Sequence, residues 1–65
     1  MVNLKAERRK AGLTQKQLGE KVGVTRTHIG NIETGSYRPS VEVAMAIAKI
    51  LGFDWTLFYV NKDKV

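Results

Sequence analysis

The sequence predicts an all-α protein built from five short helical segments. Three observations support this fold class. Residues typical of helix N-caps precede each apolar stretch, glycines follow most of these stretches, and no stretch alternates convincingly enough for a sheet. With 65 residues and no linker-like or low-complexity segment, we expect one domain, residues 1–65. Its core must be dense, because a domain of this size buries only roughly 60% of its unfolded surface.

The first two segments have clear start and stop signals. Asn3 can cap a helix that runs to about Ala11 and ends at Gly12. The second begins after Thr14, because the letters TQKQ have the T-x-x-Q pattern of a capping box. Gly23 is well placed to end this helix in the left-handed conformation.

Two further helices follow. Thr25 can cap the third, which ends near Gly35. After the loop GSYRPS, Ser40 can cap a fourth helix that ends at Leu51, with Gly52 closing it. The fourth segment is apolar on nearly every side, so we expect a central helix that the others surround, with Met45 in the core. The expected core partners are Leu4, Leu13, Leu18, Val22, Val24, Ile29, Ile32, Trp55 and Phe58.

The fifth segment, WTLFYV, is the least determined. Asp54 can cap it as a helix, although its β-branched and aromatic residues are also typical of a strand. If it is helical, Trp55, Phe58 and Tyr59 share one face. Leu57 and Val60 then form an apolar strip that nothing in the chain covers, so we expect a dimer interface at Leu57 and Val60, within residues 54–65.

Three glycines in or between the second and third helices need a reason, because a glycine inside a helix costs about 1 kcal/mol relative to alanine. Gly23 fits a sharp turn between two helices that cross steeply. Gly19 fits the point where the two backbones approach closely. Gly30 lies off the inner face of the third helix, where a missing side chain allows a bulky surface to come close.

The charge is strongly uneven. The formal net charge is +5, and residues 1–38 hold eight basic side chains against three acidic ones. Residues 39–65 hold three of each. This distribution favours a surface that faces a polyanion.

Composition argues against several other classes. The chain has no cysteine and a single histidine, so we expect no disulfide, no metal site and no cofactor. No Gly-rich phosphate loop or acid pair indicates an enzyme. No apolar run is long enough for a membrane helix, and no secretory signal is visible, so we expect a cytoplasmic protein.

An ordered set of residues runs through most of the chain: Gln15, Leu18, Gly19, Val22, Gly23, Ile29, Ile32, Glu33 and Gly35, then RPS at 38–40 and LGFDW at 51–55. This set resembles the XRE family, the Cro and phage-repressor type of helix-turn-helix proteins. The resemblance implies a five-helix, lambda-repressor-like domain with its helix-turn-helix at helices two and three, about residues 14–35. One departure is that residues 7–10 are all charged, where members keep a second apolar residue.

The resemblance implies that the third helix lies in the major groove of DNA, and its side chains suit that role. Arginine can bind guanine bidentately, asparagine can do the same with adenine, and a threonine methyl can contact thymine. The expected base contacts are Arg26, Thr27, His28 and Asn31. The expected phosphate contacts are Gln15, Thr25, Thr34, Ser36, Tyr37 and Arg38. Arg9, Lys10 and Lys16 either add unspecific attraction or serve solubility. Arg8 matches a family arginine that pairs with the glutamate matching Glu33.

Two functions remain open at this point. The first is a sequence-specific transcriptional regulator, a repressor that binds operator half-sites in double-stranded DNA as a homodimer without a small-molecule effector. The alternative is an antitoxin-type module that neutralises a toxin and represses its own operon. That alternative needs surplus apolar surface or a disordered extension that binds the toxin.

Overall fold

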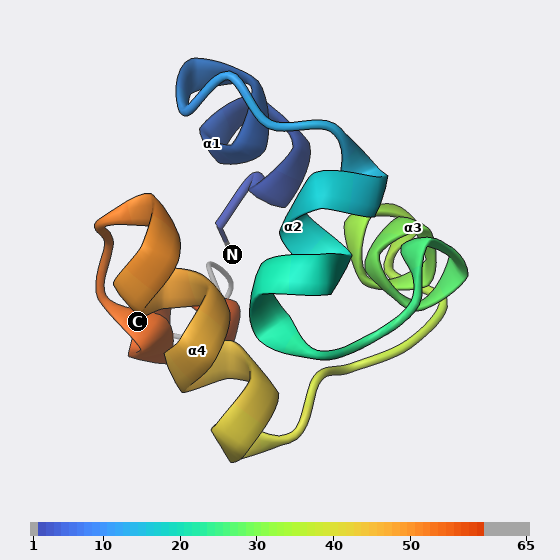
Figure 1. Cartoon of the computed structure of the whole chain (residues 1–65). Coiled ribbons are helices and arrows are strands. Elements are labelled where there is room, and N and C mark those ends of the chain that lie inside the picture. The colour runs from blue at the N-terminus through green and yellow to red at the C-terminus, as the bar shows by residue number, and fades with distance from the viewer. Residues whose placement is uncertain (1, 60–65) are drawn as a thin grey trace.

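The computed structural model describes residues 2–59, and this part of the chain is helical, without a strand. It forms four α-helices and a closing 3-10 helix, arranged as in Figure 1. They are α1 (Leu4–Lys10), α2 (Gln15–Val22), α3 (Arg26–Thr34), α4 (Val41–Leu51) and η1 (Trp55–Tyr59). The all-α prediction is confirmed, but the predicted count of five α-helices is not, because the fifth segment is a 3-10 helix. None of the described helices is long and apolar enough to span a membrane.

The predicted helix caps are confirmed. Thr14 and Gln17 form the capping box, in which each side chain bonds the backbone of the other residue. The side chains of Asn3, Thr25 and Ser40 each accept a hydrogen bond from the backbone N–H three residues further on. Local sequence signals therefore set where each helix begins.

The turn between α2 and α3 depends on two glycines. Gly23 has φ +90°, the left-handed conformation expected for the residue that ends α2. The Gly19 carbonyl accepts hydrogen bonds from the N–H groups of Gly23 and Val24, both at 2.8 Å. A Cβ at Gly19 would lie 2.7 Å from the carbonyl oxygen of Val24, so the predicted close approach is present.

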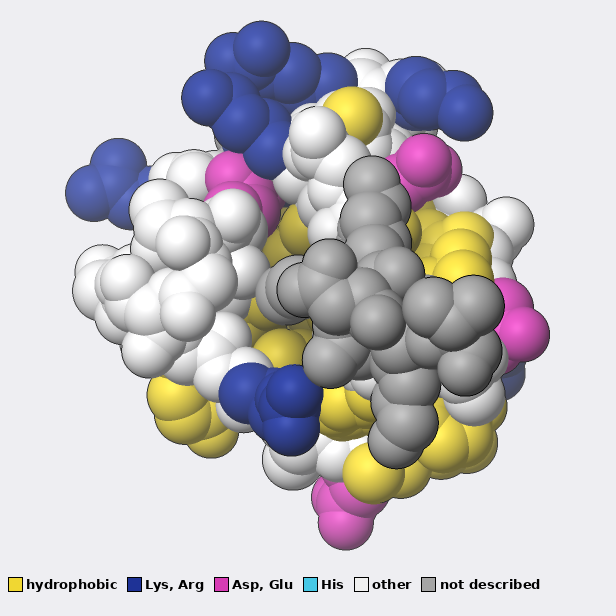
Figure 2. Space-filling view, turned by 180° about the vertical axis from the view of Figure 1, so that it is seen from behind, with side chains coloured by type: hydrophobic (Ala, Val, Ile, Leu, Met, Phe, Trp, Pro, Cys, Tyr) yellow, Lys and Arg dark blue, Asp and Glu magenta, His cyan; other side chains and the backbone are white. Residues whose placement is uncertain are grey.

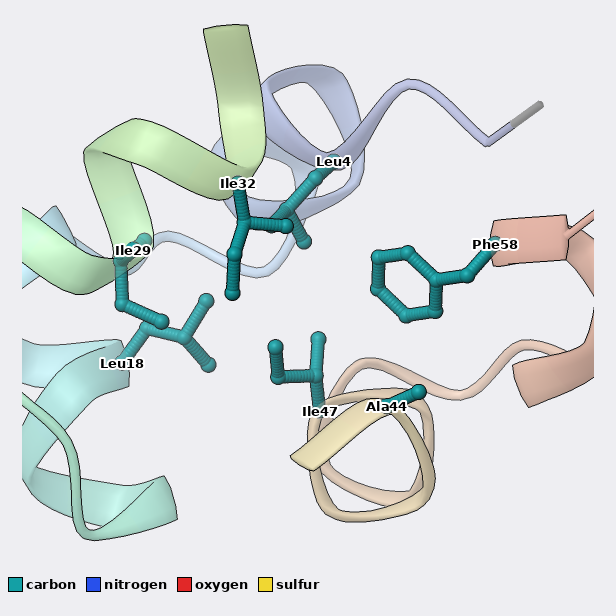
Figure 3. Packing of buried hydrophobic residues seen from close by; sticks show 7 residues of the cluster. All are labelled: Leu4, Leu18, Ile29, Ile32, Ala44, Ile47 and Phe58. Carbon is teal, nitrogen blue, oxygen red and sulfur yellow. The ribbon is translucent and has the colours of Figure 1, made fainter. Parts of the chain in front are cut away.

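The core lies where all five elements meet. Figure 3 shows side chains from each element pointing toward one another. This buried cluster consists of Leu4, Leu18, Ile29, Ile32, Ala44, Ile47 and Phe58. Leu13, Val22, Val24 and Trp55 are partly buried against it, so every core partner expected from the sequence packs there.

The expectation that α4 is surrounded is wrong. Val41 is 50% exposed and Met45 is 48% exposed, so Met45 is not a core residue. Ala44 and Ile47 provide the buried side of the helix. Among the described elements, α4 packs mainly against α2 and η1, which cover one side of it. Apolar residues on nearly every side of a helix therefore do not ensure that every side is buried.

The Asp54 side chain caps the beginning of the 3-10 helix η1. The Asp54 carboxylate accepts hydrogen bonds from both the N–H and the hydroxyl of Thr56, which lower the pKa of Asp54 below its ordinary value. Phe58 is buried, and the Tyr59 hydroxyl donates to the Pro39 carbonyl at 2.8 Å. Leu57, on the other side, is 38% exposed.

The contrast between Gly19 and Gly30 gives a test of the α2–α3 packing. We expect Gly19→Ala to lower the free energy of unfolding by about 1–3 kcal/mol, because the added methyl group would overlap the backbone of Val24 and Thr25. At Gly30 the added Cβ would be 3.6 Å from the Gln15 amide nitrogen, which is ordinary contact. Gly30→Ala is the matched control, and it should unfold at the same or higher urea concentration than the parent. Equal unfolding midpoints for the two variants would contradict the close approach.

Candidate nucleic-acid interface

A buried ion pair joins α1 to α3. The Arg8 Nε donates to Glu33 Oε2 at 2.6 Å, and the two side chains are only 10% and 5% exposed. Arg8 Nη2 lies 3.4 Å from Glu33 Oε1, and Nη1 donates to the Leu13 carbonyl at 2.9 Å. Arg8 thus makes the pair with Glu33 that the resemblance implied. Its guanidinium reaches acceptors on two other segments.

Gln15 adds α2 to this pair. Its Nε2 donates to Glu33 Oε1 at 3.0 Å, and its amide group lies across the backbone of Gly30. The surface expected to come close to Gly30 is thus the protein's own Gln15 side chain. We refer to Arg8, Gln15 and Glu33 as the Glu33 network.

The Glu33 carboxylate is held in its charged form. Burial acts to raise its pKa, but hydrogen bonds from Arg8 and Gln15, together with the positive charges of Arg8 and Lys5, outweigh burial. The pKa of Glu33 therefore lies below its ordinary value. The network is fully formed at neutral pH.

The residues of α3 that were expected to contact bases differ in exposure and in the direction they face around the helix. Arg26, Thr27 and Asn31 are exposed, while His28 is half-buried. The His28 ring packs against the Tyr37 ring with centroids 4.5 Å apart, at 59°. Arg26 and Asn31 are separated by five residues, which turns them about 140° apart around the helix. They do not share one narrow face.

The segment after α3 folds back onto the end of that helix. The hydroxyl oxygens of Thr34 and Ser36 are 3.0 Å apart, and the Tyr37 N–H donates to the Asn31 carbonyl at 3.2 Å. Tyr37 also connects this loop to α3 through its contact with His28. Sequence reasoning missed this aromatic contact, which joins an expected base contact to an expected phosphate contact.

Of the remaining expected phosphate contacts, Arg38 lies beside η1 and Thr25 caps α3. The Arg38 guanidinium carbon lies 5.6 Å from the centre of the Tyr59 ring, so this side chain is beside η1. Thr25 is exposed, and its hydroxyl oxygen accepts the cap hydrogen bond from the His28 N–H at 3.0 Å.

A shallow basic groove lies between the end of α1 and the beginnings of α2 and α3. Its volume is about 1110 Å³. The lining residues are Lys5, Arg8, Arg9, Gly12, Leu13, Thr14, Gln15, Lys16 and Arg26. Among these described residues five are basic and none is acidic. Sequence reasoning did not single out Lys5, although its spacing of four residues from Arg9 places both on one side of α1.

Basic and apolar side chains gather mainly toward different ends of the molecule. Figure 2 shows most of the Lys and Arg side chains along the upper edge, at the end where α1 lies in Figure 1, and one further basic group in the lower half. Hydrophobic side chains are concentrated in the lower half, where α4 lies. Leu57, Val41 and Met45 are among the exposed apolar residues. Val60, the other residue expected at a dimer interface, lies outside the described residues.

Comparison with known proteins agrees with this geometry. A family model described as helix-turn-helix matches residues 4–58. An uncharacterized HTH-type transcriptional regulator of Methanothermobacter thermautotrophicus is 47% identical over 62 residues, covering 92% of this chain and 90% of that protein. The uncharacterized HTH-type transcriptional regulator YqaF of Bacillus subtilis is 39% identical over 56 residues, 86% of this chain and 74% of YqaF.

A third relative is a phage protein. The immunity repressor protein of Bacillus phage phi105 is 41% identical over 49 residues, which are 75% of this chain but 34% of the repressor. No solved structure matches the chain significantly. The chain belongs to the helix-turn-helix family of the XRE type, as the resemblance in its sequence implied.

Removing the Glu33 carboxylate tests the network. We expect Glu33→Ala to lower the free energy of unfolding at pH 7 by about 3–5 kcal/mol, because Arg8 is left buried without a partner. Glu20→Ala removes an exposed carboxylate and is the control; it should change stability little. A Glu33→Ala variant that melts like the parent would show that the pair contributes no net stability.

The same network predicts a specific pH dependence. Because the folded pKa of Glu33 is lowered, its carboxylate stabilises the fold above the unfolded pKa, roughly 4.3. This contribution is lost as the pH falls through the folded pKa. The stability difference between the parent and Glu33→Gln should therefore be constant near pH 7 and shrink below about pH 4. Urea unfolding of both proteins across this range measures it, and a difference that grows in acid would have the wrong sign.

Proposed function

We propose that this member of the helix-turn-helix family is a sequence-specific DNA-binding regulator of transcription, a repressor that binds as a homodimer. The observation that carries the proposal is the placement of α3. Its inner residues Ile29 and Ile32 are buried in the core, while Arg26, Thr27 and Asn31 are exposed. A helix held in this way by a helix-turn-helix presents its outer side chains to the major groove.

Within this proposal, the base contacts come from Arg26, Thr27, His28 and Asn31. Because Arg26 and Asn31 diverge around α3, they would reach different base pairs. Arg26 is the first residue of α3 and Asn31 is the sixth of its nine residues. The contact between His28 and Tyr37 would limit the rotation of the His28 ring and so favour one orientation for reading a base edge.

The phosphate contacts would then flank α3 on both sides. Gln15 and Thr25 lie at the beginnings of α2 and α3, where free N–H groups and the helix dipole favour an anion. Thr34, Ser36, Tyr37 and Arg38 follow the end of α3. The DNA backbone on one side of the major groove would thus contact the residues that precede α3, and the backbone on the other side would contact those that follow it.

The homodimer would form through the carboxy-terminal end of a single domain, residues 1–65. Leu57 is exposed beside the buried Phe58, so an apolar side chain is available at η1. A dimer is favoured because two recognition helices then reach half-sites one helical turn apart. We propose that Leu57 and Val60 contribute to this interface.

One observation favours the antitoxin alternative. Val41 and Met45 lie one turn apart on α4, and each is about half exposed. This provides apolar surface beyond Leu57, as a protein partner would require. An antitoxin would keep the same DNA-binding surface and use α4 for the toxin.

Variants at Arg26 and Arg38 separate base reading from backbone binding. Arg26→Ala should cost about 1–3 kcal/mol on the preferred duplex and little on random DNA, because base contacts carry discrimination. Arg38→Ala should weaken binding to all sequences alike, and a thermal melt controls for loss of its contact with Tyr59. Affinities for specific and random duplexes at one salt concentration measure both effects. If Arg26→Ala weakens binding to the specific and the random duplex equally, Arg26 contacts a phosphate. The base contacts are then made by Thr27, His28 and Asn31.

Charged substitutions identify the dimer interface. The double substitution of Leu57 and Val60 by lysine should give a folded monomer, because like charges would be buried face to face. The matched control replaces Val41 and Met45 by lysine, which adds the same charge to α4 and should leave the dimer intact. Sedimentation of both variants, with circular dichroism to verify folding, gives the result. Dissociation by the α4 substitutions alone would move the interface to α4.

A further inference from the structure

We propose that the basic groove binds consecutive phosphates of one DNA strand, through Lys5 and Arg9 of α1 in addition to the beginnings of α2 and α3. This inference rests on the proposed DNA-binding function and extends its contact surface to a helix outside the helix-turn-helix. Neither Lys5 nor Arg9 belongs to the set of phosphate contacts that the resemblance implies.

The basic side chains of α1 can reach a nucleic-acid backbone together. Lys5 and Arg9 are four residues apart on one side of α1, so they are separated by about 6 Å along the helix axis. A strand of duplex DNA carries one negative charge per roughly 3.4 Å of helix axis. The separation of the two residues exceeds this axial spacing, but both side chains are long and flexible, so together they can reach neighbouring phosphates of one strand.

Most of the charge of the groove comes from side chains that form no ion pair. Arg8 is paired with Glu33, and Lys10 lies 4.0 Å from Glu7. Within residues 2–59, Lys5, Arg9, Lys16 and Arg26 form no such ion pair, and all four are exposed in or beside the groove. Lys10 does not line the groove.

The position of the groove favours the DNA backbone over a small free anion. The groove is shallow, and it ends at Arg26 in the first turn of α3 and at Gln15 and Lys16 in the first turn of α2. A strand that follows the edge of the major groove beside α3 would continue across this surface. Thr14, Gln15 and Lys16 at the beginning of α2 line the groove, so the partial positive charge of this helix end adds to the attraction.

The test replaces Lys5 and Arg9 together by glutamine, which keeps helix propensity and removes two charges. We expect the slope of log K against log salt on the specific duplex to become shallower by about 1.8 per protomer. Between about 50 and 200 mM salt, the parent should lose roughly tenfold more affinity per protomer than the variant. The ratio of specific to random affinity at fixed salt should stay the same, because phosphates carry no sequence information.

Lys10→Gln is the matched control. It removes a charge from the same helix but outside the groove, so its salt slope should equal that of the parent. Circular dichroism melts of all variants verify folding. If the parent binds DNA with a steep salt slope and the double variant keeps that slope, the groove inference is wrong while the proposed function stands. A change in selectivity would also overturn it. If the parent shows no salt-dependent DNA binding, the proposed function itself fails.

Discussion

The ion pair between Arg8 and Glu33 determines how three of the four α-helices meet. A buried pair is stable only when its remaining donors and acceptors are bonded, since desolvation of two charges costs several kcal/mol. Here the Leu13 carbonyl and the Gln15 amide complete the pair. Among the described residues, no buried side-chain nitrogen or oxygen lacks a hydrogen-bond partner. The charged sequence of α1 is therefore compatible with a packed core, because one of its charges points inward.

Much of the fold could be predicted because its signals are local. A cap residue bonds an N–H group three positions away, and a left-handed glycine needs only its own backbone conformation. Thr14 and Gly23 thus identify the ends of α2 without any knowledge of the rest of the molecule. Gly19 is less local, but a glycine placed one turn before a tight turn already indicates close contact with the next helix.

The remaining features depend on residues that are distant in sequence. Gln15 and Glu33 are separated by 18 positions, and the sequence of α2 does not show that the Gln15 amide lies over α3. The basic groove likewise combines three elements, so its charges are visible in the sequence but not their convergence. At Met45, by contrast, the sequence predicted burial that the structure does not have. An apolar residue in an apolar helix was expected inside, yet within residues 2–59 only α2 and η1 pack extensively against α4, and they leave one side of it exposed.

The Glu33 network also connects the two halves of the candidate DNA surface. Gln15 is at the beginning of α2, where a phosphate would bind, and its amide is bonded to a residue of α3. Arg8 connects the same carboxylate to α1, which carries the outer basic side chains of the groove. In the proposed complex, backbone contacts set the register in which base contacts are made. Because one buried carboxylate holds α1, α2 and α3 together, phosphates bound by α1 and α2 would fix the position of α3 in the major groove.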